Sequence, residues 1–212
     1  GRRNPSRGLR AQTVDVAWSL SNFWFMSIAL LQSAINSFTA ELDKTADADW
    51  SKATKCDGWD VTELLRHIVG GAVSASMALR GGKRDELLPF FRDYQFSENP
   101  RADYAATVAD HVKAFEEVAD PSTVVEHPVM DMPVGQLMMF RICDFALHAW
   151  DLGAAMGREV VLDPAVVEFA WNSLSPMAPM IGNTGMFGEG PSGNVPETAD
   201  LQTRLIDLTG RR

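Results

Sequence analysis

The chain has 212 residues, of which 46% are hydrophobic and 22% charged, a composition that suits a soluble globular protein. Its net charge of −9 argues against nucleic acid as a partner, because phosphate binding needs a basic surface. The two cysteines, Cys56 and Cys143, form no C-x-x-C motif. That usage is typical of a reducing compartment, so we expect a cytoplasmic protein.

The N-terminal region combines basic residues with a hydrophobic run. Four arginines lie among the first ten residues, and we expect residues 1–10 to form a flexible basic tail. The run from Trp18 to Ala34 is the most hydrophobic in the chain, but polar residues are scattered through it. It is also shorter than the ~20 apolar residues that a membrane span needs. We therefore predict a buried helix from about Ala11 to Asp43 and no membrane segment.

The remaining elements follow from caps, breaks and periodicity. The pattern Asp60-Val61-Thr62-Glu63 is typical of a capping box and predicts a helix from Val61 to about Arg80, which Gly81-Gly82 ends. Segment 83–100, which contains Pro89-Phe90-Phe91, is expected to be a charged connection that can include a short helical turn. The later elements are helices over 102–118, 135–156, 164–174 and 201–208, an extended excursion over 123–134 and an irregular loop over 175–200.

This order of elements predicts an all-α fold. Four long helices with short extra helices and one small extended excursion form a four-helix bundle. Neither an internal repeat nor a linker interrupts the chain, so we expect a single domain over 11–212.

One predicted helix carries a polar stripe on an otherwise apolar surface. Between Phe140 and Leu152 the sequence is hydrophobic on nearly every side, which is typical of a buried helix. The stripe has the spacing i, i+3, i+7 and i+10 and consists of Arg141, Asp144, His148 and Asp151. Because Asp144 and His148 lie one turn apart, they can place a carboxylate and an imidazole on one metal ion.

A third candidate ligand, His67, lies on the inner side of the 61–80 helix. Bundle cores build metal sites from side chains on facing helices. Two imidazoles and a carboxylate suit zinc or another divalent first-row metal, and three protein ligands leave positions open, as in catalytic sites. Spacing alone leaves an alternative, in which Asp144 and His148 form an ordinary ion pair and His67 is a hydrogen-bonded core residue.

The other histidines and the cysteines are expected to play no part in this site. The 102–118 helix is predicted to bury Ala105, Val108, Val112 and Phe115. That face leaves His111 at the surface, and His127, before Pro128, is expected to be exposed. Cys143 is predicted to be a buried small hydrophobe. Cys56 is not proposed as a nucleophile, because the sequence places no base near it.

Several motifs, in the same order along the chain, resemble one known family. They are Cys56-x-Gly58-Trp59-x-Val61-x-x-Leu64-Leu65-x-His67, then Asp144-x-x-x-His148-x-Trp150-Asp151-Leu152, then Gly157, and finally Arg204-Leu205-x-x-Leu208-x-Gly210-Arg211. Over about residues 30–212 the chain is similar to the DinB-like, mycothiol-dependent maleylpyruvate isomerase superfamily, in its actinobacterial metal-binding branch.

The resemblance implies a DinB-like four-helix bundle with a divalent metal, usually zinc, although nickel or iron would also suit the ligands. Carried over by position, the metal ligands are His67, Asp144 and His148. Many relatives have Glu or His at the position of Asp144, whose carboxylate is one methylene shorter than that of Glu. Arg141 and Asp151 are candidates for holding a substrate carboxylate or orienting a ligand imidazole.

These implications favour a metal-dependent S-transferase or isomerase that uses a low-molecular-weight thiol, such as mycothiol, on a small electrophile. The isomerase of this family has an additional C-terminal domain that we expect this chain to lack. The alternative is a non-catalytic metal-containing bundle that binds a small apolar ligand or a protein partner in a cleft lined by Trp24, Phe25 and Met139. A fourth protein ligand such as His111 would favour it. Homodimer formation is left open.

Overall fold

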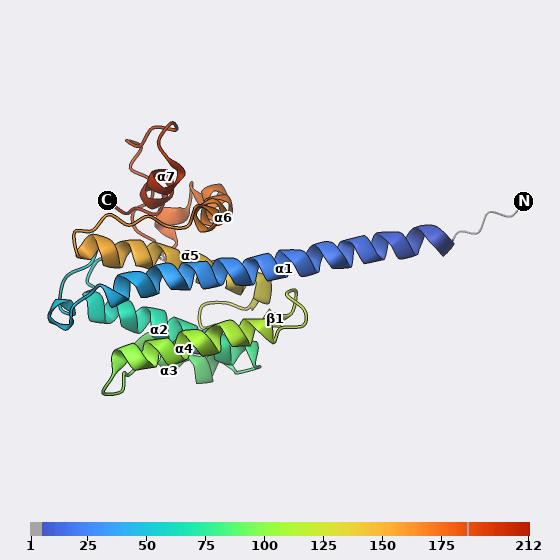
Figure 1. Cartoon of the computed structure of the whole chain (residues 1–212), viewed down its shortest axis with the longest axis horizontal. Helices are drawn as coiled ribbons and strands as arrows, with labels where there is room; N and C mark the ends of the chain where they lie inside the picture. Colours follow the sequence, from blue (N-terminus) through green and yellow to red (C-terminus); the bar gives the residue numbers. More distant parts are fainter. Residues whose placement is uncertain (1–5, 186) are drawn as a thin grey trace, which may run out of the picture.

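Helix α1 (Ser6–Asp43) is the longest element, and its first half extends beyond the rest of the bundle (Figure 1). The computed structural model describes residues 6–185 and 187–212, with side chains described from Trp24 onward except at position 186. Half of the predicted basic tail, residues 1–5, lies outside the described residues. The other half belongs to α1, which begins five residues before the expected start. The predicted single domain stays a prediction.

Four helices form a closed ring. They are α1, α2 (Val61–Leu79), α4 (Pro100–Glu116) and α5 (Val134–Ala155). Helix α1 packs against α5 and α4, and α2 packs against the same two helices from the other side. The predicted DinB-like all-α bundle is therefore confirmed. Helix α6 (Pro164–Leu174) packs against α5 and α1, and α7 (Leu201–Leu208) packs against α6, at the top of Figure 1.

The start of α2 follows from a side-chain cap. Asp60 Oδ1 accepts a hydrogen bond from the backbone amide of Glu63 at 2.9 Å, which satisfies one of the free N–H groups of the first turn. The second half of the predicted capping box is replaced by another contact, since the Glu63 carboxylate pairs with Arg66 at 2.5 Å. At the other end, Gly81 has a φ of +88°, a conformation that favours glycine and ends the helix.

The prediction for segment 83–100 was wrong, because a ten-residue helix, α3 (Arg84–Asp93), occupies most of it. Its first turn is stabilised by acidic groups: the Glu86 carboxylate accepts the Lys83 amide at 2.7 Å, and Glu126 accepts the Arg84 amide at 3.0 Å. The buried side chain of Leu87 holds the helix against α2. These tertiary contacts outweigh Pro89, which discouraged a helix in the sequence.

Helix α4 presents a different face to the core from the one predicted. Only Phe115 of the four expected core residues is fully buried, and Tyr104, His111 and Ala114 join it. The polar tips of two of them have partners inside the bundle: Tyr104 Oη lies 2.7 Å from Thr39 Oγ1, and His111 Nδ1 lies 3.0 Å from Ser76 Oγ. These partners satisfy Tyr104 Oη and His111 Nδ1, which helps the helix to turn these amphipathic residues inward, although His111 Nε2 is buried without a hydrogen-bond partner among the described residues.

The extended excursion is a small antiparallel pair, β1 (Val124–Val125) and β2 (Met132–Pro133), as predicted. The predicted loop over 175–200 contains two short 3₁₀ turns, Ser175–Met177 and Ile181–Asn183, and a third such turn, Asp47–Asp49, follows α1.

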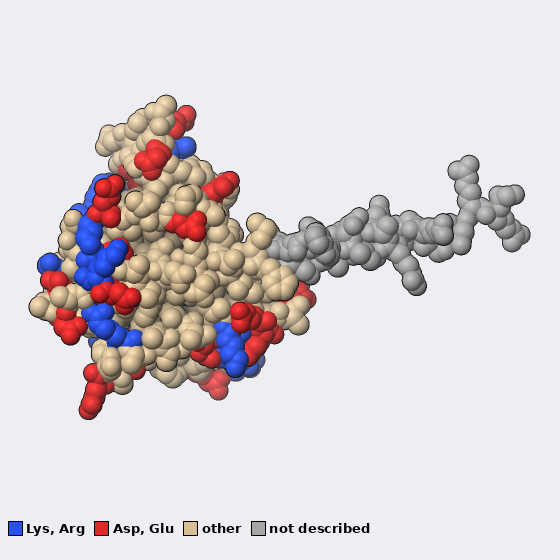
Figure 2. All heavy atoms as spheres, viewed as in Figure 1, with Lys and Arg blue, Asp and Glu red and all other residues tan. Residues whose placement is uncertain are grey.

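Acidic and basic side chains are interspersed on the face of the molecule shown in Figure 2. Within the part of the chain that the structure describes, none of the helices combines the length and apolar character needed to cross a bilayer.

Candidate metal centre

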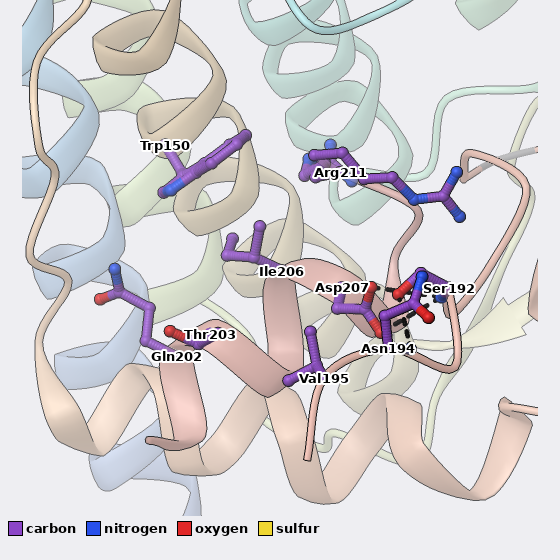
Figure 3. Close-up of a pocket in the computed structure, with 10 residues that line it drawn as sticks. Trp150, Ser192, Asn194, Val195, Gln202, Thr203, Ile206, Asp207 and Arg211 are labelled. Atoms are coloured by element: carbon purple, nitrogen blue, oxygen red, sulfur yellow. Dashed lines mark hydrogen bonds between the residues drawn. The ribbon is translucent and has the colours of Figure 1, made fainter. Parts of the chain in front are cut away.

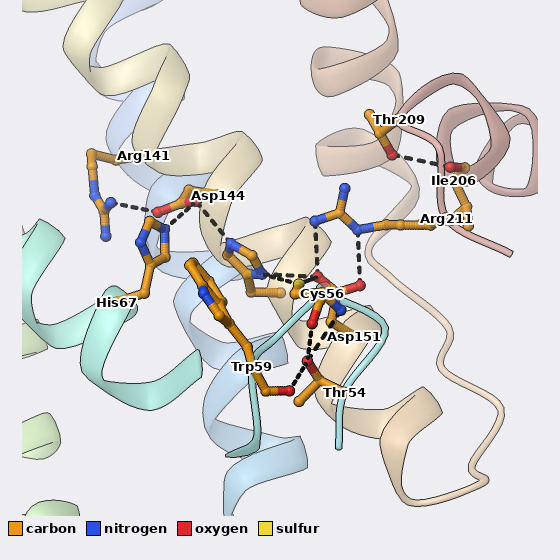
Figure 4. A network of polar contacts seen from close by, with 11 residues as sticks. Thr54, Cys56, Trp59, His67, Arg141, Asp144, Asp151, Ile206, Thr209 and Arg211 are labelled. Atoms are coloured by element: carbon orange, nitrogen blue, oxygen red, sulfur yellow. Dashed lines mark hydrogen bonds and ion pairs between the residues drawn. The ribbon is translucent and has the colours of Figure 1, made fainter. Parts of the chain in front are cut away.

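The three predicted ligands meet between α2 and α5. Figure 4 shows two of them, His67 and Asp144, facing each other. His67 projects from α2, and Asp144 and His148 project from successive turns of α5. A single carboxylate oxygen, Asp144 Oδ1, lies 3.1 Å from His67 Nε2 and 3.2 Å from His148 Nε2. His67 and Asp144 are 77 residues apart in the sequence, and the packing of α2 on α5 brings them together.

These distances suit a shared metal ion. One ligand atom from each residue lies within 4.8 Å of the others. In a tetrahedral site with metal–ligand bonds of about 2.0–2.1 Å, neighbouring ligand atoms lie about 3.3 Å apart. The observed separations of 3.1 and 3.2 Å are close to that value. They also suit hydrogen bonds, so the metal assignment depends on how the remaining atoms of the site are arranged.

The environment of His148 suits either a metal ligand or a protonated imidazole. Its Nδ1 lies 2.8 Å from Asp151 Oδ2, while its Nε2 faces Asp144. With a metal, Nδ1–H donates to Asp151 and the Nε2 lone pair is free to coordinate, which is the common carboxylate–histidine–metal arrangement. Without a metal, both nitrogens must carry protons. Burial works against that charged form, yet the two carboxylates raise the pKa of His148 well above its usual value.

Arg141 stabilises the charge of the shared carboxylate. Its Nη1 donates to Asp144 Oδ2 at 2.5 Å, and its Nη2 donates to the Ile68 carbonyl at 3.3 Å. Burial alone would raise the pKa of Asp144, but the neighbouring His67 and Arg141 hold it well below its usual value. The guanidinium is buried, and it fits because residue 71 is glycine: a Cβ there would lie 2.6 Å from Arg141 Nη1.

Besides His148, the Asp151 carboxylate contacts two side chains, those of Arg211 and Cys56. Arg211, after α7, donates from Nε to Oδ1 at 2.9 Å and from Nη2 to Oδ2 at 2.8 Å. The Cys56 thiol donates to Oδ2 at 3.3 Å. Burial opposes the charge on Asp151, but His148 and Arg211 lower its pKa to about 2. Two roles were considered for Asp151, holding a substrate carboxylate and orienting a ligand imidazole. Its contacts are consistent with the second role.

Cys56 and Arg211 were missed as site residues. The expectation that no base lies near Cys56 was wrong, since its Sγ lies 3.8 Å from His148 Nδ1 as well as close to Asp151. The contacts join residues 95 and 60 positions apart, so local periodicity could not reveal them. The signal that was present is their occurrence in the motifs quoted above.

Trp59 covers part of the cluster. Its indole lies 4.8 Å from the imidazole of His67 and 5.9 Å from that of His148, measured between ring centroids. The His67 side chain is 27% exposed and that of Asp144 21% exposed, whereas Asp151 is fully buried. The cluster is therefore open to solvent on the His67 side and closed on the Asp151 side.

The other histidines lie outside this cluster. The prediction that His111 is a surface residue was wrong, because it is fully buried, with its ring 5.1 Å from that of Phe115. Burial lowers the pKa of His111 well below its usual value. His127 is partly buried against Phe91 rather than exposed. Cys143 is buried as predicted, and burial raises the pKa of its thiol to about 12.

A pocket of about 500 Å³ lies between α5, α7 and the loop around Ser192 (Figure 3). Trp150 on its wall is about 160° around α5 from His148, so the pocket opens on the opposite side of that helix. Arg211 lines the pocket and also binds Asp151. The apolar cleft considered in the sequence is not formed as expected, since Trp24 packs against Phe115 and Phe25 is 70% exposed.

Fold and site together define a class of protein, a four-helix bundle with a candidate three-ligand metal centre between two of its helices. The sequence profile of the mycothiol maleylpyruvate isomerase N-terminal domain matches residues 31–153. The chain belongs to this family, which confirms the resemblance noted in the sequence.

The chain is also similar to individual proteins and solved structures. Two uncharacterised proteins from strains of Mycobacterium tuberculosis, Rv0738 and MT0763, are each 27% identical over 156 residues, which cover 71% of this chain and 77% of the relative. Among solved structures, mycothiol-dependent maleylpyruvate isomerase matches with a TM-score of 0.57 at 17% identity, and a histidine-to-alanine mutant of it with 0.60 at 16%. Both matches cover 73% of this chain and 69% of the other, and they show a shared fold.

Proposed function

We propose that this chain is a cytoplasmic metalloenzyme that uses a low-molecular-weight thiol, mycothiol, on a small electrophile, as an S-transferase or isomerase. His67, Asp144 and His148 hold a divalent first-row metal, with zinc the best match to two imidazoles and a carboxylate. Family membership supports the thiol, because the matching family is named for a mycothiol-dependent isomerase.

The observation that carries the metal assignment is the placement of His148 between two carboxylates. Asp151 accepts a hydrogen bond from Nδ1–H at 2.8 Å, so the lone pair of Nε2 is available to a metal beside Asp144. Arg141 compensates the second oxygen of Asp144, which leaves Oδ1 to face the two imidazoles. The contact with Asp151 orients His148 Nε2, and the contact with Arg141 orients Asp144 Oδ1. Both atoms then face the space beside His67 Nε2.

When bound at these three ligands, a divalent metal lowers the pKa of a coordinated thiol and supplies thiolate at neutral pH. The chain's own residues would place the reactants. Trp59 forms an apolar wall beside the open side of the cluster and limits water there. Asp151 and Arg141 keep the ligand side chains in fixed orientations, which preserves the open positions for thiol and electrophile.

The non-catalytic alternative is less well supported by the structure. It would be favoured by a fourth protein ligand that closes the site. His111, the residue considered for that part, instead contacts Ser76 and lies outside the ligand groups found among the described residues. Three ligands with solvent access on one side match a catalytic site better than a structural one.

A direct assay tests the proposed function. Purified protein loaded with zinc is mixed with mycothiol and either maleylpyruvate or a model alkylating electrophile, and loss of substrate and of free thiol is followed. We expect turnover that requires both mycothiol and metal, and that is lost in His67→Ala. Metal-loaded protein that binds neither thiol nor electrophile would contradict the proposal and favour the non-catalytic bundle.

A further inference from the structure

Two groups of candidate ligands overlap at His148. The first contains His67, Asp144 and the Nε2 atom of His148. The second contains Cys56, Asp151 and the Nδ1 atom of His148, again with one ligand atom of each within 4.8 Å of the others. A thiolate, an imidazole and a carboxylate are also suitable zinc ligands, and the thiolate favours soft metals more strongly than the first group does. A neutral imidazole has one protonated nitrogen and one nitrogen with a free lone pair. His148 can therefore offer a lone pair to only one of the two groups at a time.

Arg211 lies against the second group. Its guanidinium holds both oxygens of Asp151, at 2.9 and 2.8 Å, in a bidentate pair. The Asp151 side chain is fully buried and that of Arg211 only 10% exposed, so water screens the pair weakly. A cation fixed on this carboxylate disfavours a metal ion at the same place, because like charges repel strongly in such surroundings.

We propose that Arg211 is a positioning residue that selects the first ligand group over the second, an inference that depends on the proposed metal centre. By holding both oxygens of Asp151 in place, Arg211 keeps this carboxylate as the acceptor for Nδ1–H of His148, 2.8 Å away. The Nε2 lone pair then points toward Asp144 and His67. The Cys56 sulfur, 3.3 Å from Asp151 Oδ2, belongs to the second group, and with Asp151 engaged by Arg211 that group lacks a free carboxylate ligand.

Removing the charge of Arg211 should therefore have two consequences. Metal binding by the first group weakens, because His148 loses its fixed orientation; loss of such an outer partner typically costs roughly 10- to 100-fold in metal affinity. In addition, the second group becomes able to bind a metal through the sulfur of Cys56, with release of the thiol proton to solvent.

Cobalt(II) distinguishes the two groups, since a bound cysteine thiolate gives an intense near-ultraviolet charge-transfer band that nitrogen and oxygen ligands lack. Metal-free wild type, Arg211→Gln and Arg211→Lys are titrated with cobalt(II), with folding checked by circular dichroism. We expect the thiolate band in Arg211→Gln only, because lysine keeps the positive charge. Adding Cys56→Ser to Arg211→Gln should abolish the band. In the Cys56→Ser background, Arg211→Gln should bind cobalt roughly 10- to 100-fold more weakly.

Failure of this inference differs from failure of the proposed function. Wild type that binds no cobalt would overturn both. Wild type that binds cobalt through His67, together with an Arg211→Gln variant that shows no band and unchanged affinity, would overturn only the role of Arg211. A thiolate band in wild type would do the same. If Arg211→Gln does not fold, Arg211→Lys in the Cys56→Ser background decides: lysine cannot hold both oxygens, so unchanged affinity would contradict the proposal.

Discussion

Asp151 Oδ2 lies 2.8 Å from His148 Nδ1, while the other nitrogen of the same imidazole faces Asp144 at 3.2 Å. This relationship links the buried side of the bundle to the solvent-accessible cluster. It makes His148, on α5, the residue at which the orientation of the site is set.

Replacing Asp144 by glutamate should weaken metal binding roughly tenfold. The aspartate oxygen already lies 3.1 Å from His67 Nε2 and 3.2 Å from His148 Nε2, and an added methylene would push the carboxylate forward by about 1.5 Å. It would also disturb the contact with Arg141. Competition with a chelating dye measures the affinity, and Asp85→Glu at an exposed position is the matched control. Equal or tighter binding by Asp144→Glu would show that the helix spacing is not set for aspartate.

Gly71→Ala should destabilise the fold by about 1–3 kcal/mol. The new Cβ would lie 2.6 Å from Arg141 Nη1, in a buried site where the guanidinium also binds Asp144. Urea unfolding gives the free energy of unfolding, and metal affinity should fall in parallel because Asp144 loses a partner. Gly135→Ala is the control, since its Cβ would meet only ordinary contacts at 3.6 Å and beyond. No difference between the two variants would mean that Arg141 relaxes freely.

His111 should make the fold less stable in acid. Burial holds its pKa well below 6.5 in the folded state, so below pH 6.5 the unfolded chain binds a proton that the folded chain does not. The stability that neutral His111 contributes is therefore present above pH 6.5 and lost progressively as the pH falls toward the folded pKa. Denaturant unfolding at several pH values gives the free energy of unfolding of wild type and His111→Gln. The difference between the two proteins should become smaller as the pH falls. A gap independent of pH would contradict this account.

Local signals in the sequence located most helices. The predicted bounds of α6 and α7 match the structure, in which Asp163 and Asp200 each accept a backbone amide in the first turn of the helix that follows. Helix α5 was likewise located to within one residue by its apolar periodicity and Gly157. These features depend on neighbours in the chain, which is why a sequence reveals them.

What the sequence did not reveal depends on distant partners. The burial of His111 follows from Ser76 on another helix, and α3 forms because Glu126 and the surface of α2 support it. In the candidate site, the i, i+4 spacing predicted that Asp144 and His148 lie one helical turn apart. Assigning His67 to the same site required the family motif as well. The contacts of Cys56 and Arg211 with Asp151 could be found only in three dimensions.

The most direct test of the account is elemental analysis of the protein purified without chelator and without a metal-affinity tag. We predict about one divalent first-row metal ion per wild-type chain and none in a variant with His67, Asp144 and His148 all replaced by alanine. Metal-free wild type that takes up no metal on titration would contradict the central claim, as would stoichiometric metal retained by the triple variant.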